Sequence, residues 1–371
     1  MSFTLQAESG GARAGVLDTP RGPVQTPCFM PVATQASVKA LDADDLARLN
    51  PRAILANSYH LYLRPGTETV KAAGGLHAFM GGYDGFIITD SGGFQVLSLS
   101  KLRAVDDEGV TFRSHLDGSK HRLTPESVIA VQAELGSDGW TTLDECPPYP
   151  CAEADAARAL ERTRRWLDRS VPAVAAARAA GAKSLFFPLY QGGLHPRLRR
   201  PSAEHHNDCP ADGISIGGFM VGEDKPTTWA MLGETTALLR ADRPRYLMGV
   251  GTPSDIWDAA ACGVDMMDCV YPTRVARSGH IMTASGKFNV TNARFRRDFT
   301  PLDPECSCFV CARYTKAYLG HLLRASELAA YRLLSYHNLH FMAGVAAQAR
   351  AAVLAGRFAS ARADFLARLS S

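Results

Sequence analysis

The sequence lacks the features that mark a membrane-anchored or disulfide-bonded protein. No run of about 18 apolar residues is present, so no segment is long enough to cross a bilayer as a helix. Residues 1–15 contain no basic-then-apolar leader. The nine cysteines are an odd number, and six of them are scattered along the chain, unlike the paired cysteines of a disulfide framework. We therefore expect a cytoplasmic protein with no membrane contact.

The sequence also has little net charge. Lysine and arginine number 40 and aspartate and glutamate 37, so the net charge of +3 cannot by itself attract a polyanion. A local basic surface would be needed, and residues 274–297 contain six basic residues but no acidic one. The six are Arg274, Arg277, Lys287, Arg294, Arg296 and Arg297. Because an apolar stretch ending in Asp268 precedes them, the region predicts a carboxylate beside a phosphate-binding surface, as chemistry on a nucleic acid requires.

Glycine patterns typical of nucleotide-binding folds are absent as well. Asp90-Ser91-Gly92-Gly93 contains glycines, but it has neither the dinucleotide-binding nor the P-loop spacing. Instead, seven short apolar runs end in a polar residue or glycine and are separated by helix-like segments. They span residues 53–56, 86–89, 140–143, 185–190, 214–216, 246–248 and 264–267. Continuous apolar runs are typical of parallel strands that are buried on both faces.

One of the connecting segments has a clear helical pattern. Residues 152–180 are rich in alanine and arginine and place Leu160, Trp166 and Leu167 at helical intervals before Gly181. We expect Pro172 to break or kink this helix, because proline lacks the backbone N–H that a helix interior uses.

We predict an α/β fold, specifically a TIM (β/α)8 barrel with a zinc-binding insertion near the C-terminus. The carboxyl ends of barrel strands meet at one mouth, so this fold would gather polar residues from distant parts of the chain into one site. The residues at those ends are Asp90, Asp144, Gln191, Gly218 and Asp268. The predicted organisation is one barrel domain over residues 1–371, with a zinc-binding subdomain inserted at residues 300–345.

Three cysteines in one short loop predict the metal site. Cys306, Cys308 and Cys311 supply most of a tetrahedral zinc site and need one further donor. Helix-like segments at residues 314–323 and 327–334 follow, so a histidine beyond them could fold back onto the loop; the candidates are His321, His337 and His340. Four protein donors would fill the coordination shell, so the zinc would be structural. A redox-active or simply buried cysteine cluster is the alternative.

Five motifs together resemble the queuine or tRNA-guanine transglycosylases. They are residues 90–96, 144–150, 246–251 and 267–274 and the cysteine loop at 306–311. The resemblance covers nearly the whole chain and is to the bacterial branch. That family is a TIM barrel with a zinc-binding insertion. It exchanges the wobble guanine of tRNAs with GUN anticodons for 7-aminomethyl-7-deazaguanine (preQ1), a step in queuosine biosynthesis.

The resemblance implies a role for two aspartates. Asp268 would be the nucleophile that attacks the anomeric carbon of the ribose and forms a covalent ribosyl-aspartate intermediate. Asp90 would be the general acid and base that protonates the departing guanine and deprotonates the incoming base. This is the logic of retaining glycoside chemistry. Without the resemblance, Asp268 could equally cap a strand end or pair with an arginine, and Asp90 could cap a helix.

The resemblance also implies how the purine is bound. Asp144 and Gln191 would read its hydrogen-bonding edge together with the backbone of Gly218, while Phe94 and Met248 would contact its two faces. Without the family, the default is a structural role in loops for Asp144 and Gln191 and in the core for Phe94 and Met248.

The remaining implied partners are tRNA, zinc and a second subunit. Arg274 and Arg277 match positions that grip the anticodon loop, where a splayed base can be reached without opening a duplex. The family pattern selects His337 as the fourth ligand of one structural Zn²⁺ per subunit, beside Cys306, Cys308 and Cys311. Family members are typically homodimers. For two further groups of arginines the sequence leaves two interpretations, contacts with tRNA phosphates or a solvated basic surface. The groups are Arg294, Arg296 and Arg297, and Arg197, Arg199 and Arg200.

Departures from the family pattern leave the incoming base open. Phe94 stands where some bacterial relatives have tyrosine, and Phe219-Met220 stands where leucine and a small residue are usual. Val221 and Cys146 are similar to the preQ1-using type, with queuine as the alternative base. Other hypotheses are a sugar-cleaving barrel glycosidase, a non-catalytic tRNA-binding accessory subunit and a zinc-dependent nucleic-acid-binding module.

Overall fold

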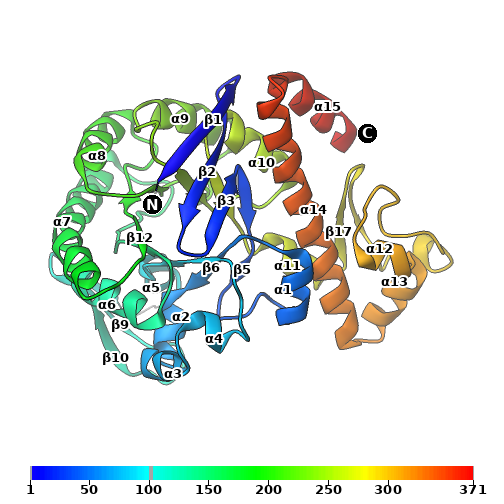
Figure 1. The fold of residues 1–371 in the computed structure, drawn as a ribbon, viewed down its shortest axis with the longest axis horizontal. Coiled ribbons are helices and arrows are strands. Elements are labelled where there is room, and N and C mark those ends of the chain that lie inside the picture. The colour runs from blue at the N-terminus through cyan, green and yellow to red at the C-terminus, as the bar shows by residue number, and fades with distance from the viewer. Residues whose placement is uncertain (1, 100–102, 371) are drawn as a thin grey trace.

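Two five-stranded parallel sheets form the centre of the computed structural model, which describes residues 2–99 and 103–370 (Figure 1). The first sheet has the order β12-β11-β7-β6-β5 and the second β13-β14-β15-β16-β4. The first comprises β5 (Val32–Ala33), β6 (Ala53–Asn57), β7 (Phe86–Asp90), β11 (Gly139–Thr141) and β12 (Leu185–Phe187). The second comprises β4 (Cys28–Met30), β13 (Leu189–Tyr190), β14 (Ile214–Ile216), β15 (Arg245–Met248) and β16 (Met266–Asp268).

The chain passes directly from one sheet to the other at two places. Only Pro31 separates β4 from β5, and only Pro188 separates β12 from β13. The carbonyls of these two prolines still accept hydrogen bonds from the neighbouring strands, at Leu55 N and Ser215 N respectively, each at 3.0 Å. Side chains from both sheets share one core cluster, which includes Ile88, Phe86, Phe187, Tyr246 and Met266.

An antiparallel sheet contributes to the same core cluster. It consists of β1 (Phe3–Ser9), β2 (Ala12–Thr19) and β3 (Gly22–Thr26), and its residues Phe3, Leu17 and Val24 pack in that cluster. A second antiparallel sheet follows β7 and consists of β8 (Arg103–Asp106), β9 (Gly109–Arg113) and β10 (Lys120–Leu123). The sequence patterns did not predict either sheet.

The predicted apolar runs all form parallel strands, but β4 and β5, at residues 28–33, were missed. The apolar residues of this stretch are flanked and interrupted by Pro27 and Pro31, and proline inside a run argues against a central strand. The structure accommodates Pro31 by placing it at the step between the two sheets.

Helices surround the parallel strands (Figure 1). They are α1 (Ala43–Leu49), α2 (Ser58–Leu63), α3 (Thr67–Ala72), α4 (Leu76–Phe79), α5 (Gly93–Leu99), α6 (Pro125–Leu135), α7 (Glu153–Ala179), α8 (Pro196–Asp208), α9 (Lys225–Ala237), α10 (Pro253–Ala261) and α11 (Tyr271–Ala276). Local sequence fixes several starts: α6 and α10 begin with capping boxes at Thr124 and Thr252, each followed by proline in the first turn.

Helix α7 runs without interruption through Pro172, so the expected break does not occur, and the kink, the other expected outcome, stays a prediction. Leu167 and Val174, one on each side of the proline, are buried in the same apolar cluster against Trp140 and Phe186. Because both halves of the helix are anchored in that cluster, packing offsets the backbone hydrogen bond that proline cannot make.

The C-terminal part begins with β17 (His280–Thr283), β18 (Gly286–Asn289), the 3₁₀ helix η1 (Ala293–Phe295), α12 (Phe309–Arg313) and α13 (Lys316–Arg324), and it ends with α14 (Leu328–Leu354) and α15 (Phe358–Ser370). Strand β17 and helices α12 and α13 lie on the side of α14 away from the sheets (Figure 1). Arg332 of α14 forms a two-pronged ion pair with Asp45 of α1, at 2.6 and 2.7 Å. Arg350 donates to the carbonyl of Gly15 at 2.8 Å. Thus α14 joins the cysteine loop to the rest of the molecule. Within the described ranges, no helix is both long and apolar enough to span a bilayer.

Candidate active site and metal centre

A cavity of about 390 Å³ lies at the carboxyl ends of the parallel strands. This volume falls within the range of about 300–1,000 Å³ that is typical of small-molecule pockets. Of the nine residues with an implied role in catalysis or in binding base or tRNA, eight line it: Asp90, Phe94, Asp144, Gln191, Gly218, Met248, Asp268 and Arg274. Arg277, the ninth, lies one turn beyond Arg274 and is not part of the lining.

Asp268 is the last residue of β16 and is 6% exposed. The hydroxyl of Tyr246 donates to its Oδ1 at 2.6 Å. The register explains this contact: Met248 pairs with Asp268, and Tyr246, two residues earlier on β15, lies on the same face of the strand. Burial raises the pKa of Asp268 to about 7, and the phenol hydrogen bond opposes that rise. Burial also holds the pKa of Tyr246 well above 10, so its hydroxyl stays a donor.

Asp90 ends β7 and is 8% exposed. Three groups donate to its carboxylate: the Asn57 side-chain amide, the Gln95 amide at 2.8 Å and the Ser58 backbone N–H at 2.9 Å. Burial raises the pKa of Asp90 to about 6, and these donors limit the rise. Burial thus raises the pKa of both carboxyls, and the groups that donate to each carboxylate limit the rise.

The other end of the cavity contains a third buried acid. Gln191 Nε2 donates to Asp144 Oδ2 at 2.7 Å, and burial raises the pKa of Asp144 to about 6. The Oε1 atom of Gln191 is buried and has no hydrogen-bond partner. Buried polar atoms are rarely left unpaired, so this end of the cavity is suited to a ligand that donates hydrogen bonds.

Only glycine fits at position 218. Its φ is +78°, and a Cβ there would lie 2.8 Å from Gln191 Oε1 and 3.1 Å from an Arg199 nitrogen. The bare backbone can therefore approach a ligand closely. Phe94, at the start of α5, is 54% exposed, so its ring is available to a planar ligand, and Met248 is half-buried at the end of β15.

The basic residues after Asp268 differ in exposure. Arg274 is exposed on α11 at the cavity, whereas Arg277 is half-buried and donates to the carbonyl of Thr273 at 3.0 Å. Arg294, Arg296 and Arg297 are exposed around η1.

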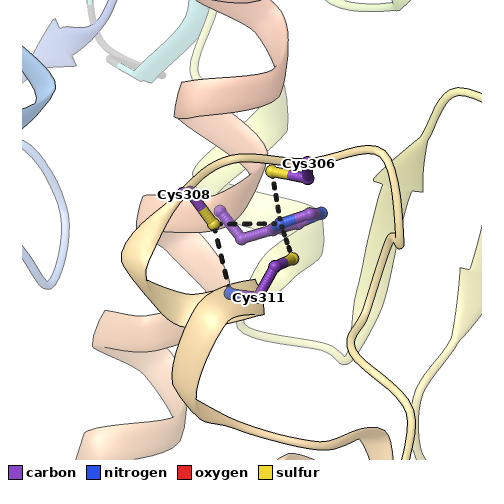
Figure 2. A group of neighbouring side chains, drawn as sticks. Cys306, Cys308 and Cys311 are labelled. Carbon is purple, nitrogen blue, oxygen red and sulfur yellow. Dashed lines mark hydrogen bonds between the residues drawn. The ribbon is translucent and has the colours of Figure 1, made fainter.

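The predicted cysteines come together with His337. The ligand atoms of Cys306, Cys308, Cys311 and His337 all lie within 4.8 Å of one another. Figure 2 shows the three thiols turned toward one another from the loop that precedes α12 and from its first turn. The Nδ1 atom of His337 lies 3.7 Å from Cys306 Sγ, 3.6 Å from Cys308 Sγ and 3.3 Å from Cys311 Sγ.

These spacings suit a tetrahedral ion. With bonds of about 2.3 Å to sulfur and about 2.0–2.1 Å to nitrogen, a tetrahedral zinc site has sulfur–nitrogen edges of about 3.5 Å. His337 Nε2 lies 3.0 Å from the carbonyl of Met282, a hydrogen bond that leaves Nδ1 free as a ligand. His340 places its Nδ1 3.7 Å from Cys306 Sγ, but among the described residues neither it nor His321 belongs to the four-donor group.

Comparisons with known proteins agree with this geometry. A family model described as queuine tRNA-ribosyltransferase matches residues 8–371. A queuine tRNA-ribosyltransferase of Desulforudis audaxviator is 51% identical over 356 residues, which are 96% of this chain and 94% of the relative. Another of Solidesulfovibrio magneticus is 49% identical over 364 residues, 98% of this chain and 96% of the relative. This chain belongs to the queuine tRNA-ribosyltransferase family.

Sequence reasoning overlooked several residues around the cavity of this family member. Asn57 and Gln95 donate to Asp90 and Tyr246 donates to Asp268, but the sequence assigned none of these three residues a role in the site. A signal existed for two of them, since Asn57 ends an apolar run and Tyr246 lies two residues before Met248. Arg199 was left open as a phosphate contact, yet it is 1% exposed and lies behind the cavity.

Proposed function

We propose that this protein is a tRNA-guanine transglycosylase. It exchanges the wobble guanine of tRNAs with GUN anticodons for preQ1, a step in queuosine biosynthesis. The observation that carries the proposal is that Asp90 and Asp268, far apart in the chain, line one cavity of about 390 Å³ in a queuine tRNA-ribosyltransferase family member.

In the first step, a carboxylate oxygen of Asp268 attacks the anomeric carbon of the ribose. The glycosidic bond breaks, guanine leaves with a proton from Asp90, and a ribosyl ester of Asp268 forms. In the second step, Asp90 takes a proton from the incoming base, whose nitrogen attacks the same carbon and releases Asp268. Two inversions give net retention, as in retaining glycosidases.

The chemistry requires Asp268 to be ionised while Asp90 carries a proton. Burial places the pKa values of both groups near neutrality, at about 7 and about 6, so a pair holding one proton is accessible at physiological pH. The proposed mechanism places that proton on Asp90, which protonates the departing base, and leaves Asp268 ionised to attack the ribose.

The other end of the cavity recognises the base. Asp144 accepts from the ring N–H and exocyclic amine of guanine, and the N–H of Gly218 donates to the carbonyl. Gln191 contributes a further amide at the same edge. Phe94 and Met248 contact the faces of the ring by stacking and sulfur contact.

The tRNA approaches over α11, where Arg274 and Arg277 contact the anticodon loop. Single-stranded loops allow a base to be splayed into a pocket at little cost, which suits a cavity that accepts one purine. The exposed Arg294, Arg296 and Arg297 extend the basic surface.

The bulky side chains at the cavity wall favour preQ1 over queuine. Phe219, Met220 and Val221 line the cavity, and Met220 adopts a positive φ of 59°. Large side chains at these positions leave less room for the cyclopentene ring of queuine than for an aminomethyl group. A sugar-cleaving hydrolase would also use two carboxyl groups, but the cysteine cluster and basic α11 have no part in that reaction.

We further propose that the two parallel sheets close into a TIM (β/α)8 barrel. The direct passages through Pro31 and Pro188 and the sharing of one core by both sheets support closure. In this proposal residues 1–371 form one barrel domain, with residues 300–345 as its zinc-binding subdomain. A homodimer is proposed by analogy with the family alone.

The cysteine cluster is proposed to hold one Zn²⁺ per subunit. Three thiolates and an imidazole are the donors that zinc prefers, and their spacings match a tetrahedral site. With four protein donors the ion would cross-link the loop to α14 and would take no part in the reaction.

Exchange of radiolabelled guanine into a tRNA with a wobble guanine tests the function. The wild-type protein should incorporate label, unlabelled preQ1 should displace it, and queuine should compete less well. Asp268→Ala should incorporate none, and a tRNA with adenine at the wobble position should stay unlabelled. Absence of incorporation by wild type, or equal incorporation by Asp268→Ala, would contradict the proposal.

A further inference from the structure

Arg199 of α8 has its guanidinium buried behind the base end of the cavity. Its Cζ lies 4.1 Å from the centroid of the Phe219 ring and 5.0 Å from that of Tyr190. A cation against aromatic faces is held by the ring quadrupoles, more strongly when both are removed from water. Phe219, one of the departures from the family pattern, thus packs directly on this arginine.

The guanidinium donates to the backbone of two loops that shape the cavity. Nε donates to the carbonyl of Gly193 at 2.9 Å, and a terminal nitrogen donates to the carbonyl of Gly217 at 3.0 Å. Gly193 follows Gln191, and Gly217 precedes Gly218, so one side chain fixes both loops of the base-binding end.

The bond to Gly217 determines where the N–H of Gly218 points. The carbonyl of Gly217 and the N–H of Gly218 belong to one planar peptide, and in a trans peptide the C=O and N–H point in opposite directions. Holding the carbonyl toward Arg199 therefore turns the N–H away from it. Gly218 lines the cavity beside Cys146, and its backbone opposes the rise in the pKa of the Cys146 thiol, so an N–H turned away from Arg199 lies on the cavity side.

The charge on Arg199 also strengthens that donor. Burial lowers the pKa of Arg199 to about 10, so the group remains a cation at neutral pH. A cation bound to the carbonyl polarises the peptide and makes its N–H a better hydrogen-bond donor. The second terminal nitrogen of Arg199 is buried without a partner, a cost that an apolar residue serving only to fill space would avoid.

We propose that Arg199 is the positioning residue that makes the cavity specific for 6-oxopurines, by presenting the N–H of Gly218 to the carbonyl of the base. This inference rests on the proposed base exchange. A purine with an amine at that position would present a donor to a fixed donor, which is strongly disfavoured. A purine whose group at the 6-position is only a weak hydrogen-bond acceptor would gain little from the N–H of Gly218.

Arg199→Met tests the inference in the guanine-exchange assay, with 6-thioguanine as a competing base. The thione keeps the ring N–H and exocyclic amine of guanine but accepts hydrogen bonds weakly. We expect the KM for guanine to rise roughly tenfold, as the loss of a charge-assisted hydrogen bond would give. The inhibition constant of 6-thioguanine should change less than about threefold, and kcat at saturating guanine should also stay within about threefold.

Two variants separate positioning from simple support of the fold. Arg350→Met removes another arginine that donates to two backbone carbonyls, those of Gly15 and Thr26, away from the cavity, and should leave both constants unchanged. Arg199→Lys keeps the charge and one donor, so its KM for guanine should lie between those of wild type and Arg199→Met. It also carries the test if the methionine variant does not fold.

Equal loss of affinity for guanine and 6-thioguanine would overturn the inference, because a support role would weaken both bases alike. An unchanged KM for guanine would overturn it too. Wild-type exchange is measured in the same experiment, so failure of the proposed function would appear there and would not be mistaken for failure of the Arg199 assignment.

Discussion

The cysteine cluster takes three of its four donors from residues 306–311, whereas the cavity takes its lining from strand ends and loops spread between Val32 and Arg274. A local cluster can be recognised from spacing, because three thiols in a short loop have few other arrangements. A site assembled from strand ends has no such spacing. Its members become visible only when the fold, or a family that shares it, brings them together.

The two regions also treat their polar groups differently. In the cluster, the four ligand atoms face one another. In the cavity, Gln191 Oε1 lacks a partner and three aspartates are buried with raised pKa values. Buried polar atoms without a hydrogen-bond partner and buried carboxyls with raised pKa values lower the stability of the fold, and they are typical of sites for binding and catalysis. The comparison therefore supports the proposal that the cluster is structural and that the chemistry takes place in the cavity.

Asp90→Asn should give the largest effect that separates the two regions. An amide cannot transfer the proton, so exchange should fall by about 10²- to 10⁴-fold. Bound metal and the free energy of unfolding should stay close to wild type, because the cluster is untouched. Single-turnover guanine exchange, metal analysis and urea unfolding measure these three quantities. A rate within about threefold of wild type would remove Asp90 from the mechanism.

Cys308→Ser should have the opposite profile. The variant should bind much less than one metal ion per chain and lose more than about 4 kcal/mol of unfolding free energy, since loss of a structural metal is among the largest single-site effects. The matched control is Cys262→Ser, a half-buried cysteine outside the cluster that should keep full metal content. Full metal stoichiometry in Cys308→Ser would contradict the ligand assignment.

Tyr246→Phe should sharpen the account of the cavity by a smaller, pH-dependent effect. The phenol stabilises the charged form of Asp268, so its removal should raise the pKa of that carboxyl above about 7. Because the nucleophile must be ionised, kcat/KM for tRNA should fall off at a pH about one unit higher than in wild type. At pH values above this fall, kcat/KM should return toward the wild-type value.

A matched control for this variant is Tyr83→Phe. Tyr83 is buried like Tyr246, but its hydroxyl donates to the carbonyl of Pro51, and neither residue lines the cavity. Its removal should leave the pH profile unchanged. A Tyr246→Phe enzyme that loses activity equally at every pH would show that the phenol only supports packing.

The sequence predicts the repeated parts of the fold better than the exceptions. Apolar runs identify the strands that contain Ile54, Ile87 and Leu247, because burial on both faces leaves continuous apolar residues. It misses β4 and β5, at residues 28–33, where two prolines hide the pattern, and of the break or kink that it expects at Pro172 the break does not occur. In both cases tertiary packing outweighs a local preference that the sequence states clearly.

The same limit applies to the candidate site. Asp90 and Asp268 are recognisable at strand ends, but their partners Asn57 and Tyr246 are ordinary residues of buried strands until the register is known. Arg199 lies in the basic stretch Arg197–Arg200, so sequence alone treats it as a possible phosphate contact. Its burial comes from the packing of α8 against the loops after β13 and β14.

Mapping the covalent intermediate is the most direct measurement of the central claim. Wild-type protein incubated with a wobble-guanine tRNA, quenched in acid, digested and analysed by mass spectrometry should carry a ribose phosphate that lacks its base on the peptide that contains Asp268. That adduct should disappear when preQ1 is added before the quench. An adduct on another residue, or base exchange that proceeds with no adduct at all, would contradict an ester of Asp268 as the intermediate.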